Sequence, residues 1–79
     1  MPTVFRFMGF RFSFFSNDHE PIHIHVTKGG DAAKFNVIPQ VKLVKNIGFK
    51  KSELKMVESI IEENKEIIIN RWKEFFSEE

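Results

Sequence analysis

The segment PIHIHVTKGGDAAKFNVIP, residues 21–39, is the most informative part of this chain about its fold. If Gly29-Gly30 is the turn, the two flanking segments sort into an apolar side and a polar side under a single register. The apolar side receives the cross-strand pairs Ile22–Val37, Ile24–Phe35 and Val26–Ala33, and the polar side receives His23–Asn36, His25–Lys34 and Thr27–Ala32. Lys28 and Asp31 close the turn as an opposite-charge pair. The sequence therefore predicts an antiparallel hairpin with one buried face.

A second hairpin is predicted from TVFRFMGFRFSFF, residues 3–15, which also alternates with period two. A two-residue turn at Met8-Gly9 sets Phe7 opposite Phe10, Phe5 opposite Phe12 and Arg6 opposite Arg11, with the four phenylalanines on one face. Methionine is a poor first turn residue because this turn needs positive φ. The alternation still decides the register, because a slip of one residue would expose the core face.

The C-terminal third changes to a helical period after a short strand or extended segment at 41–44. Between about Lys51 and Phe76 the apolar residues recur at spacings of three, four and seven: Leu54, Val57, Ile61, Ile68, Trp72 and Phe75. Phe49 and Leu54 fit a hydrophobic staple and Glu53 fits a capping box, although Lys50 is a poor N-cap. A single helix would be long for the sheet, and Ile67-Ile68-Ile69 widens its apolar stripe. Either the helix breaks near Asn64 or its second half packs on another subunit.

These patterns predict one α+β domain over residues 1–79, with a sheet in 1–49 and a helix in 50–77. We expect an antiparallel sheet of two hairpins, with four or five strands, covered on its Phe/Ile face by the long C-terminal helix.

The composition excludes several classes of protein. The chain has no cysteine, so it can form neither disulfides nor cysteine-based zinc sites. It shows no signal-peptide pattern and no apolar run long enough for a membrane span, so we expect a cytoplasmic protein without membrane contact. Residues 1–51 carry eight Lys and Arg against three Asp and Glu, whereas residues 52–79 carry four against eight. A basic half next to an acidic half suggests anion or acidic-partner binding, or a simple segregation of surface charge.

The chain resembles, nearly end to end, the small bacterial domain-of-unknown-function family 4160. The resemblance is carried by PTVFRFMGFRFSFFSND (2–18), EPIHIHVTKGG (20–30), AKF (33–35) and a closing EEN…W…F. That family is uncharacterised, and its occurrence in two-gene cassettes of toxin–antitoxin type implies a small protein partner encoded by the adjacent gene. The family usually has Ser or Thr at the helix cap where this chain has Lys50, a difference that concerns stability.

The candidate site residues gather on the polar side of the predicted sheet. His23 and His25 could chelate a metal together with His19 or Glu20, although a lysine beside His25 disfavours this, and we expect no metal or other cofactor. A small RNase toxin could use His23 and His25 as base and acid with Lys34 stabilising developing charge, although no nucleophile or orienting carboxylate is defined by spacing. As a binding surface, His23, His25, Lys34 and Asn36 could meet the phosphates and bases of RNA or DNA.

Arg6 and Arg11 raise a separate question, because like charges directly opposite on a hairpin are destabilising. They could grip a phosphate or carboxylate, or they could meet a glutamate of the acidic helix. We favour a structural or partner-binding role for this pair.

The function we expect is that of a non-enzymatic interaction module, one component of a toxin–antitoxin-like pair. Its expected partners are the neighbouring gene product and, as a further candidate, RNA or DNA. A homodimer through the C-terminal helix would account for the Ile67–Ile69 run. A small His-dependent RNase toxin and a metal-binding domain remain the alternatives.

Overall fold

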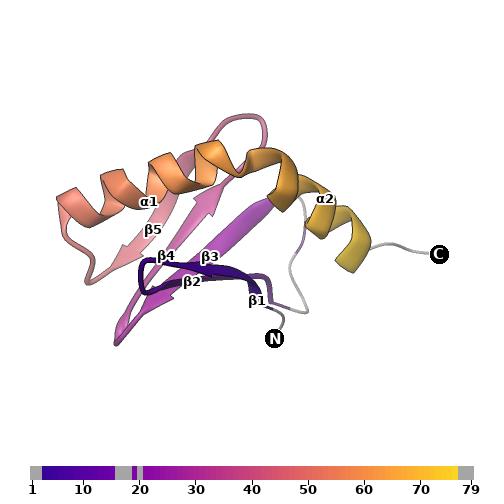
Figure 1. Cartoon of the computed structure of the whole chain (residues 1–79). Helices are drawn as coiled ribbons and strands as arrows, with labels where there is room; N and C mark the ends of the chain where they lie inside the picture. The colour runs from indigo at the N-terminus through magenta and orange to yellow at the C-terminus, as the bar shows by residue number, and fades with distance from the viewer. Residues whose placement is uncertain (1–2, 16–18, 20, 77–79) are drawn as a thin grey trace.

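The structure, a computed structural model, describes residues 3–15, 19 and 21–76. The elements follow in the order β1 (Thr3–Phe7), β2 (Phe10–Ser13), β3 (His23–Lys28), β4 (Asp31–Asn36), β5 (Lys42–Ile47), α1 (Lys51–Glu63) and α2 (Lys65–Phe75). The five strands form one antiparallel sheet in chain order, and the two helices lie across one side of it (Figure 1). The predicted α+β class is therefore confirmed.

Both predicted hairpin registers are confirmed. Phe5 pairs with Phe12 and Arg6 with Arg11 in the first hairpin. In the second, every predicted pair from His23–Asn36 to Lys28–Asp31 is present. Met8 and Gly9 form the first turn with φ of +53° and +86°. Methionine thus accepts the left-handed region because the alternation of the strands requires a two-residue turn.

The core lies between the sheet and the helices. Its fully buried side chains come from β2, β3, β4 and the helices, and include Phe12, Ile24, Phe35, Val57, Ile61 and Ile68. Phe7 shares the core side of the sheet by register but is 51% exposed. It belongs to an edge strand, where the helix layer covers it incompletely.

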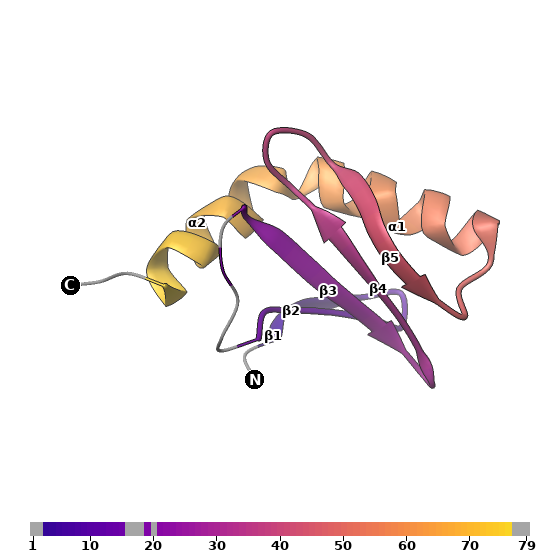
Figure 2. The same cartoon turned by 180° about the vertical axis from the view of Figure 1, so that it is seen from behind.

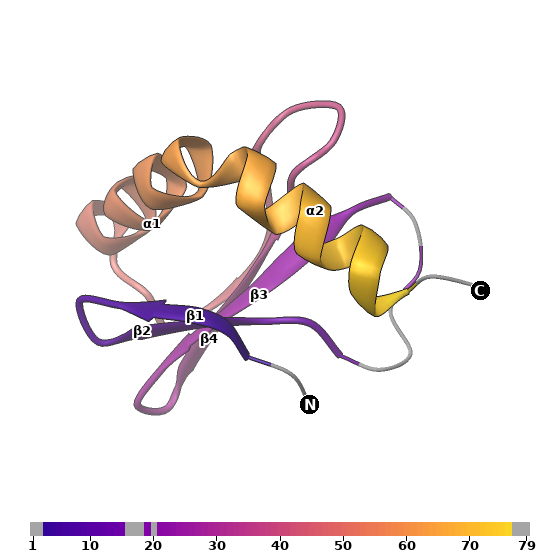
Figure 3. The same cartoon turned by 45° about the vertical axis from the view of Figure 1, so that its right-hand side comes forward.

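The helix breaks at Asn64, as one of the two predicted alternatives required. The backbone of Asn64 leaves helical geometry with φ −112° and ψ 20°. Its side-chain amide donates a hydrogen bond of 2.8 Å to the carbonyl oxygen of Ile60, in competition with the helical backbone. The break lets α2 change direction and pass over the first residues of β3 (Figure 3).

The strand after Pro39 is longer than the segment 41–44 that its sequence suggested. β5 runs over Lys42–Ile47, and its register shifts opposite Lys34 and Phe35. Lys45 pairs with Lys34 and Leu43 with Phe35, so Val44 is the extra residue of a bulge. Because a bulge interrupts the period-two alternation, the full length of the strand could not be recognised from the sequence. Within the described part of the chain, neither helix is long and apolar enough to cross a membrane.

Candidate functional site

The side of the sheet that faces away from the helices is strongly basic. We call this side the open face; Figure 2 shows it in front of the helices. By register it carries the side chains of Arg6, Arg11, Lys34, Lys42 and Lys45. Among the described strand residues Asp31 alone is acidic, and its pairing with Lys28 places it on the opposite, covered side. The open face is therefore a surface of positive potential.

A shallow hollow lies in the middle of the open face. It has a volume of about 320 Å³ and is lined by Phe15, His25, Thr27, Ala32, Ala33, Lys34, Lys45 and Ile47. Lys34 and Lys45 are direct cross-strand partners, so two lysine side chains from adjacent strands line the hollow next to each other. Like charges at this spacing destabilise a sheet, which suggests selection for something other than stability.

An aromatic platform forms another part of the same hollow. The ring of Phe15, which follows β2, stacks on the imidazole of His25 with centroids 3.7 Å apart and planes 10° from parallel. Phe15 is 37% exposed although it is a large apolar side chain. Flat, partly exposed rings beside ammonium groups can accept a planar ligand that carries negative charge.

Of the predicted binding residues, His25 and Lys34 line this hollow together. Asn36 lies in the next row of the open face, opposite Lys42. Arg6 and Arg11 lie in the row of Thr27. The structure thus collects most of the predicted candidates on one surface.

His23 departs from the expectation that both histidines of the pair lie on a polar surface. Its side chain is only 4% exposed. Its ring packs edge-on against Trp72, with centroids 5.2 Å apart, and Nδ1 donates a hydrogen bond of 2.9 Å to the carbonyl oxygen of Pro21. By register His23 lies on the same side of the sheet as His25, as predicted, but it is not exposed there, because α2 extends across the beginning of β3 and Trp72 covers the imidazole.

Arg11 has a local partner. Its Nε donates a hydrogen bond of 2.9 Å to the hydroxyl oxygen of Thr3 across the first hairpin. The helices lie on the other side of the sheet (Figure 1), so a helical glutamate is badly placed to neutralise the pair Arg6–Arg11. A contact with a helical glutamate therefore does not account for the pair, and the structural or partner-binding role of Arg6 and Arg11 stays a prediction.

The metal candidates are not assembled into a site by the described residues. His19 is exposed, His23 is buried, and Glu20 lies outside the described residues. No group of three or more His, Cys, Asp or Glu side chains that could hold a metal ion occurs within residues 3–15, 19 and 21–76.

Sequence reasoning missed three residues of the open face: Phe15, Lys42 and Lys45. Phe15 could have been found, because the alternation of residues 10–15 places it on the side of Arg11. The two lysines could not, since a spacing of three puts residues on opposite faces of a regular strand and only the bulge at Val44 brings them together.

The comparisons with known proteins support a family and nothing finer. Searches of curated proteins and of solved structures found no match. A family model described as "Domain of unknown function (DUF4160)" matches residues 9–73, which include β2 to β5, α1 and most of α2. The chain therefore belongs to the DUF4160 family.

Proposed function

We propose that this protein binds single-stranded RNA on the open face of its sheet, as the non-enzymatic component of a bacterial toxin–antitoxin-like pair. The observation that carries the proposal is the set of five cationic side chains on one sheet face with no described strand carboxylate among them. Cations on such a surface gain affinity for a phosphate backbone by releasing its counterions.

The aromatic platform favours a single strand over a duplex. The bases of a single strand can be splayed onto a sheet and stacked on aromatic rings, whereas the bases of a duplex are stacked on one another. The Phe15–His25 stack lies in the same hollow as Lys34 and Lys45, so one nucleotide could place its base against the rings and its phosphate at the ammonium groups.

The burial of His23 favours binding over catalysis. General acid–base cleavage needs two groups within reach of the same reacting atoms. His25 lines the hollow, but His23 is 4% exposed behind Trp72. A histidine-dependent RNase that uses this pair as acid and base would first have to displace α2.

The protein partner in this proposal is the product of the adjacent gene, and the compartment is the cytoplasm. Both follow from the family resemblance and the composition, and neither defines a docking surface on this chain.

The proposal is tested with a short fluorescein-labelled single-stranded RNA and fluorescence anisotropy. Lys34→Glu/Lys45→Glu should weaken binding by more than about tenfold, because it reverses two charges that line the hollow. The matched control is Lys51→Glu/Lys55→Glu, which makes the same charge change on exposed residues of α1. A similar loss in both variants would show that only net charge matters, and no binding by the wild type would refute the proposal.

The stacking part is tested separately with Phe15→Leu, which keeps an apolar side chain but removes the ring. Loss of one stacked base should cost about 1–3 kcal/mol of RNA affinity. Phe75→Leu is the control, since Phe75 is similarly exposed, at 41%, but belongs to α2. Duplex RNA of the same sequence should compete poorly. RNA cleavage that disappears in His25→Ala would instead establish the RNase alternative.

A further inference from the structure

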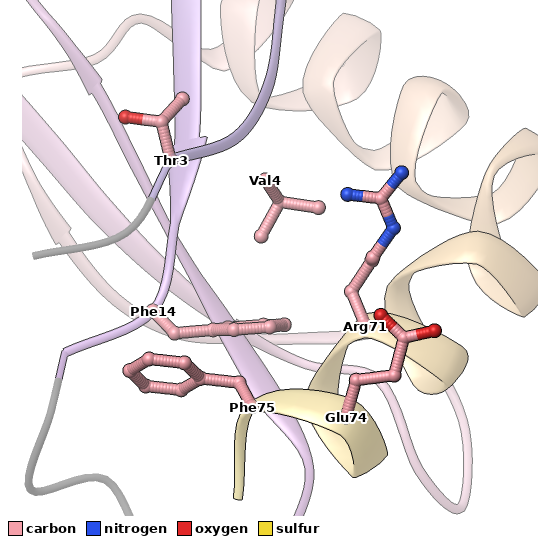
Figure 4. A pocket seen from close by; sticks show the side chains of 6 residues that line it. All are labelled: Thr3, Val4, Phe14, Arg71, Glu74 and Phe75. Atoms are coloured by element: carbon pink, nitrogen blue, oxygen red, sulfur yellow. The ribbon is translucent and has the colours of Figure 1, made fainter.

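The edge strand β1 and helix α2 enclose a groove on the covered side of the sheet. One part, of about 490 Å³, is lined by Val4, Phe5, Phe7, Glu63, Asn64, Ile67 and Arg71. A second part, of about 240 Å³, is lined by Thr3, Val4, Phe14, Arg71, Glu74 and Phe75 (Figure 4). Val4 and Arg71 line both parts, so the two parts adjoin each other beside β1. It lies outside the open face and serves no step of the proposed RNA binding.

The groove is bordered by large apolar side chains that remain in contact with solvent. Phe7 is 51% exposed and Ile67 is 48% exposed, on opposite walls, and Phe75 is 41% exposed at the far end. Contiguous exposed apolar surface of this kind on a small domain indicates an interaction site.

The two edges of the sheet differ in how they resist pairing with another strand. β5 carries Lys42 and Lys45 and is interrupted by the bulge at Val44, which are devices that natural edge strands use against association. β1 also has a register shift, between Thr3 and Phe5, and carries Arg6, but it has no lysine or proline and its residues 5–7 pair regularly with β2. Among the described residues β1 pairs with β2 alone, so its outer row of backbone groups is available for a further strand.

We propose that the occupant is β1 of a second copy of this chain, added antiparallel to the first. A strand added there would direct alternate side chains into the groove, and the apolar side chains that fit are those of β1 itself, Phe5 and Phe7.

The charges at the groove favour a second copy over a foreign peptide. The lining of the groove carries both signs of charge, from Arg71 and from the glutamates Glu63 and Glu74. Figure 4 shows the guanidinium of Arg71 and the carboxylate of Glu74 projecting from α2 on the side that faces Val4. In a two-fold pair the same patch meets itself, so the arginine of each copy can face carboxylates of the other. A uniformly acidic or basic segment would leave one sign unmatched.

The pairing would also extend the sheet. Two antiparallel β1 strands related by a two-fold axis perpendicular to the sheet would place both open faces on the same side. This inference does not depend on RNA binding, and it is tested without RNA.

Sedimentation velocity at micromolar concentration should show a dimer for the full wild-type chain. Phe7→Glu and Ile67→Glu should each weaken dimerisation by more than about tenfold, because they put a charge on either wall of the groove. Both residues are about half exposed, so the variants should stay folded by circular dichroism. Met56→Glu, at a residue of α1 that is 42% exposed, is the matched control and should remain dimeric.

A second measurement locates the contact on the strand. Because the chain contains no cysteine, single cysteines can be introduced without background. Under mild oxidation Arg6→Cys or Phe7→Cys should yield covalent dimer, whereas Val44→Cys on the other edge should not. A monomeric wild type, a dimer that survives Phe7→Glu, or cross-linking through position 44 alone would each overturn the inference. So would a complex with the neighbouring gene product that replaces the self-association and is lost in Phe7→Glu.

Discussion

The two faces of the sheet receive alternate residues of the same strands, yet they are built on opposite rules. The covered face is filled with apolar side chains such as Phe12, Ile24 and Phe35, each at most 1% exposed. The open face places like charges next to each other twice, at Arg6–Arg11 and at Lys34–Lys45. The first arrangement stabilises the fold and the second costs stability. The open face is therefore not arranged for stability, and this contrast indicates that it serves binding.

The largest expected effect concerns the covered face. Phe12→Ala should lower the free energy of unfolding by about 3–5 kcal/mol, because Phe12 is fully buried and stacks on Phe5 with centroids 4.6 Å apart. Lys34→Ala, at a residue of β4 on the open face, should change the free energy of unfolding by no more than about 0.5 kcal/mol. Urea denaturation followed by circular dichroism measures both. Comparable losses would mean that the open face also supports the fold.

Most of this fold was predictable from the sequence, for a specific reason. The segments 3–15 and 22–38 alternate so regularly that only one register places most of the apolar residues of each hairpin on one face. A break near Asn64 was one of two predicted alternatives, because an amide sits poorly on the apolar stripe, and the structure shows this amide bonded to the carbonyl oxygen of Ile60. β5 was predicted too short, since its bulge at Val44 interrupts the alternation.

The candidate site was only partly predictable. Pairing alone placed His25 and Lys34 side by side, because local register determines which side chains are neighbours on a sheet. The burial of His23 could not be foreseen, since it depends on where Trp72 lies once α2 has turned at Asn64. Contacts between a helix and the end of a strand are set by tertiary packing, and no periodicity in the sequence encodes them.

The two histidines of β3 lie on the same side of the sheet by register, because they are two residues apart, but only His23 is buried, under Trp72. His23→Ala should destabilise the protein by about 1–3 kcal/mol, since it removes the bond to Pro21 and the edge contact with Trp72 in a buried place. His25→Ala should cost about 0.5–1 kcal/mol, from its stack with Phe15. The single variants must be compared by denaturant midpoint, because the double variant would mix lost stability with lost binding. A larger loss for His25→Ala than for His23→Ala would contradict the burial of His23 against Trp72.

The smallest expected effect lies in the helix layer, away from both the open face and the β1 groove. Lys50 is the N-cap of α1, with extended φ of −79° and ψ of 159°, and its side chain makes no capping hydrogen bond. Half of a capping box is already present, because the backbone N–H of Lys50 donates a bond of 2.9 Å to Oε1 of Glu53. The lysine ammonium cannot accept a hydrogen bond, whereas a serine hydroxyl could accept one from the backbone N–H of Glu53.

Lys50→Ser should therefore raise the free energy of unfolding by about 0.5–1.5 kcal/mol, read as a higher urea midpoint with an unchanged slope. RNA affinity should stay the same, since Lys50 lies outside the open face. A stabilised variant that also binds RNA more weakly would show that the basic surface continues past the sheet to the start of α1, and the separation of the two faces would fail there.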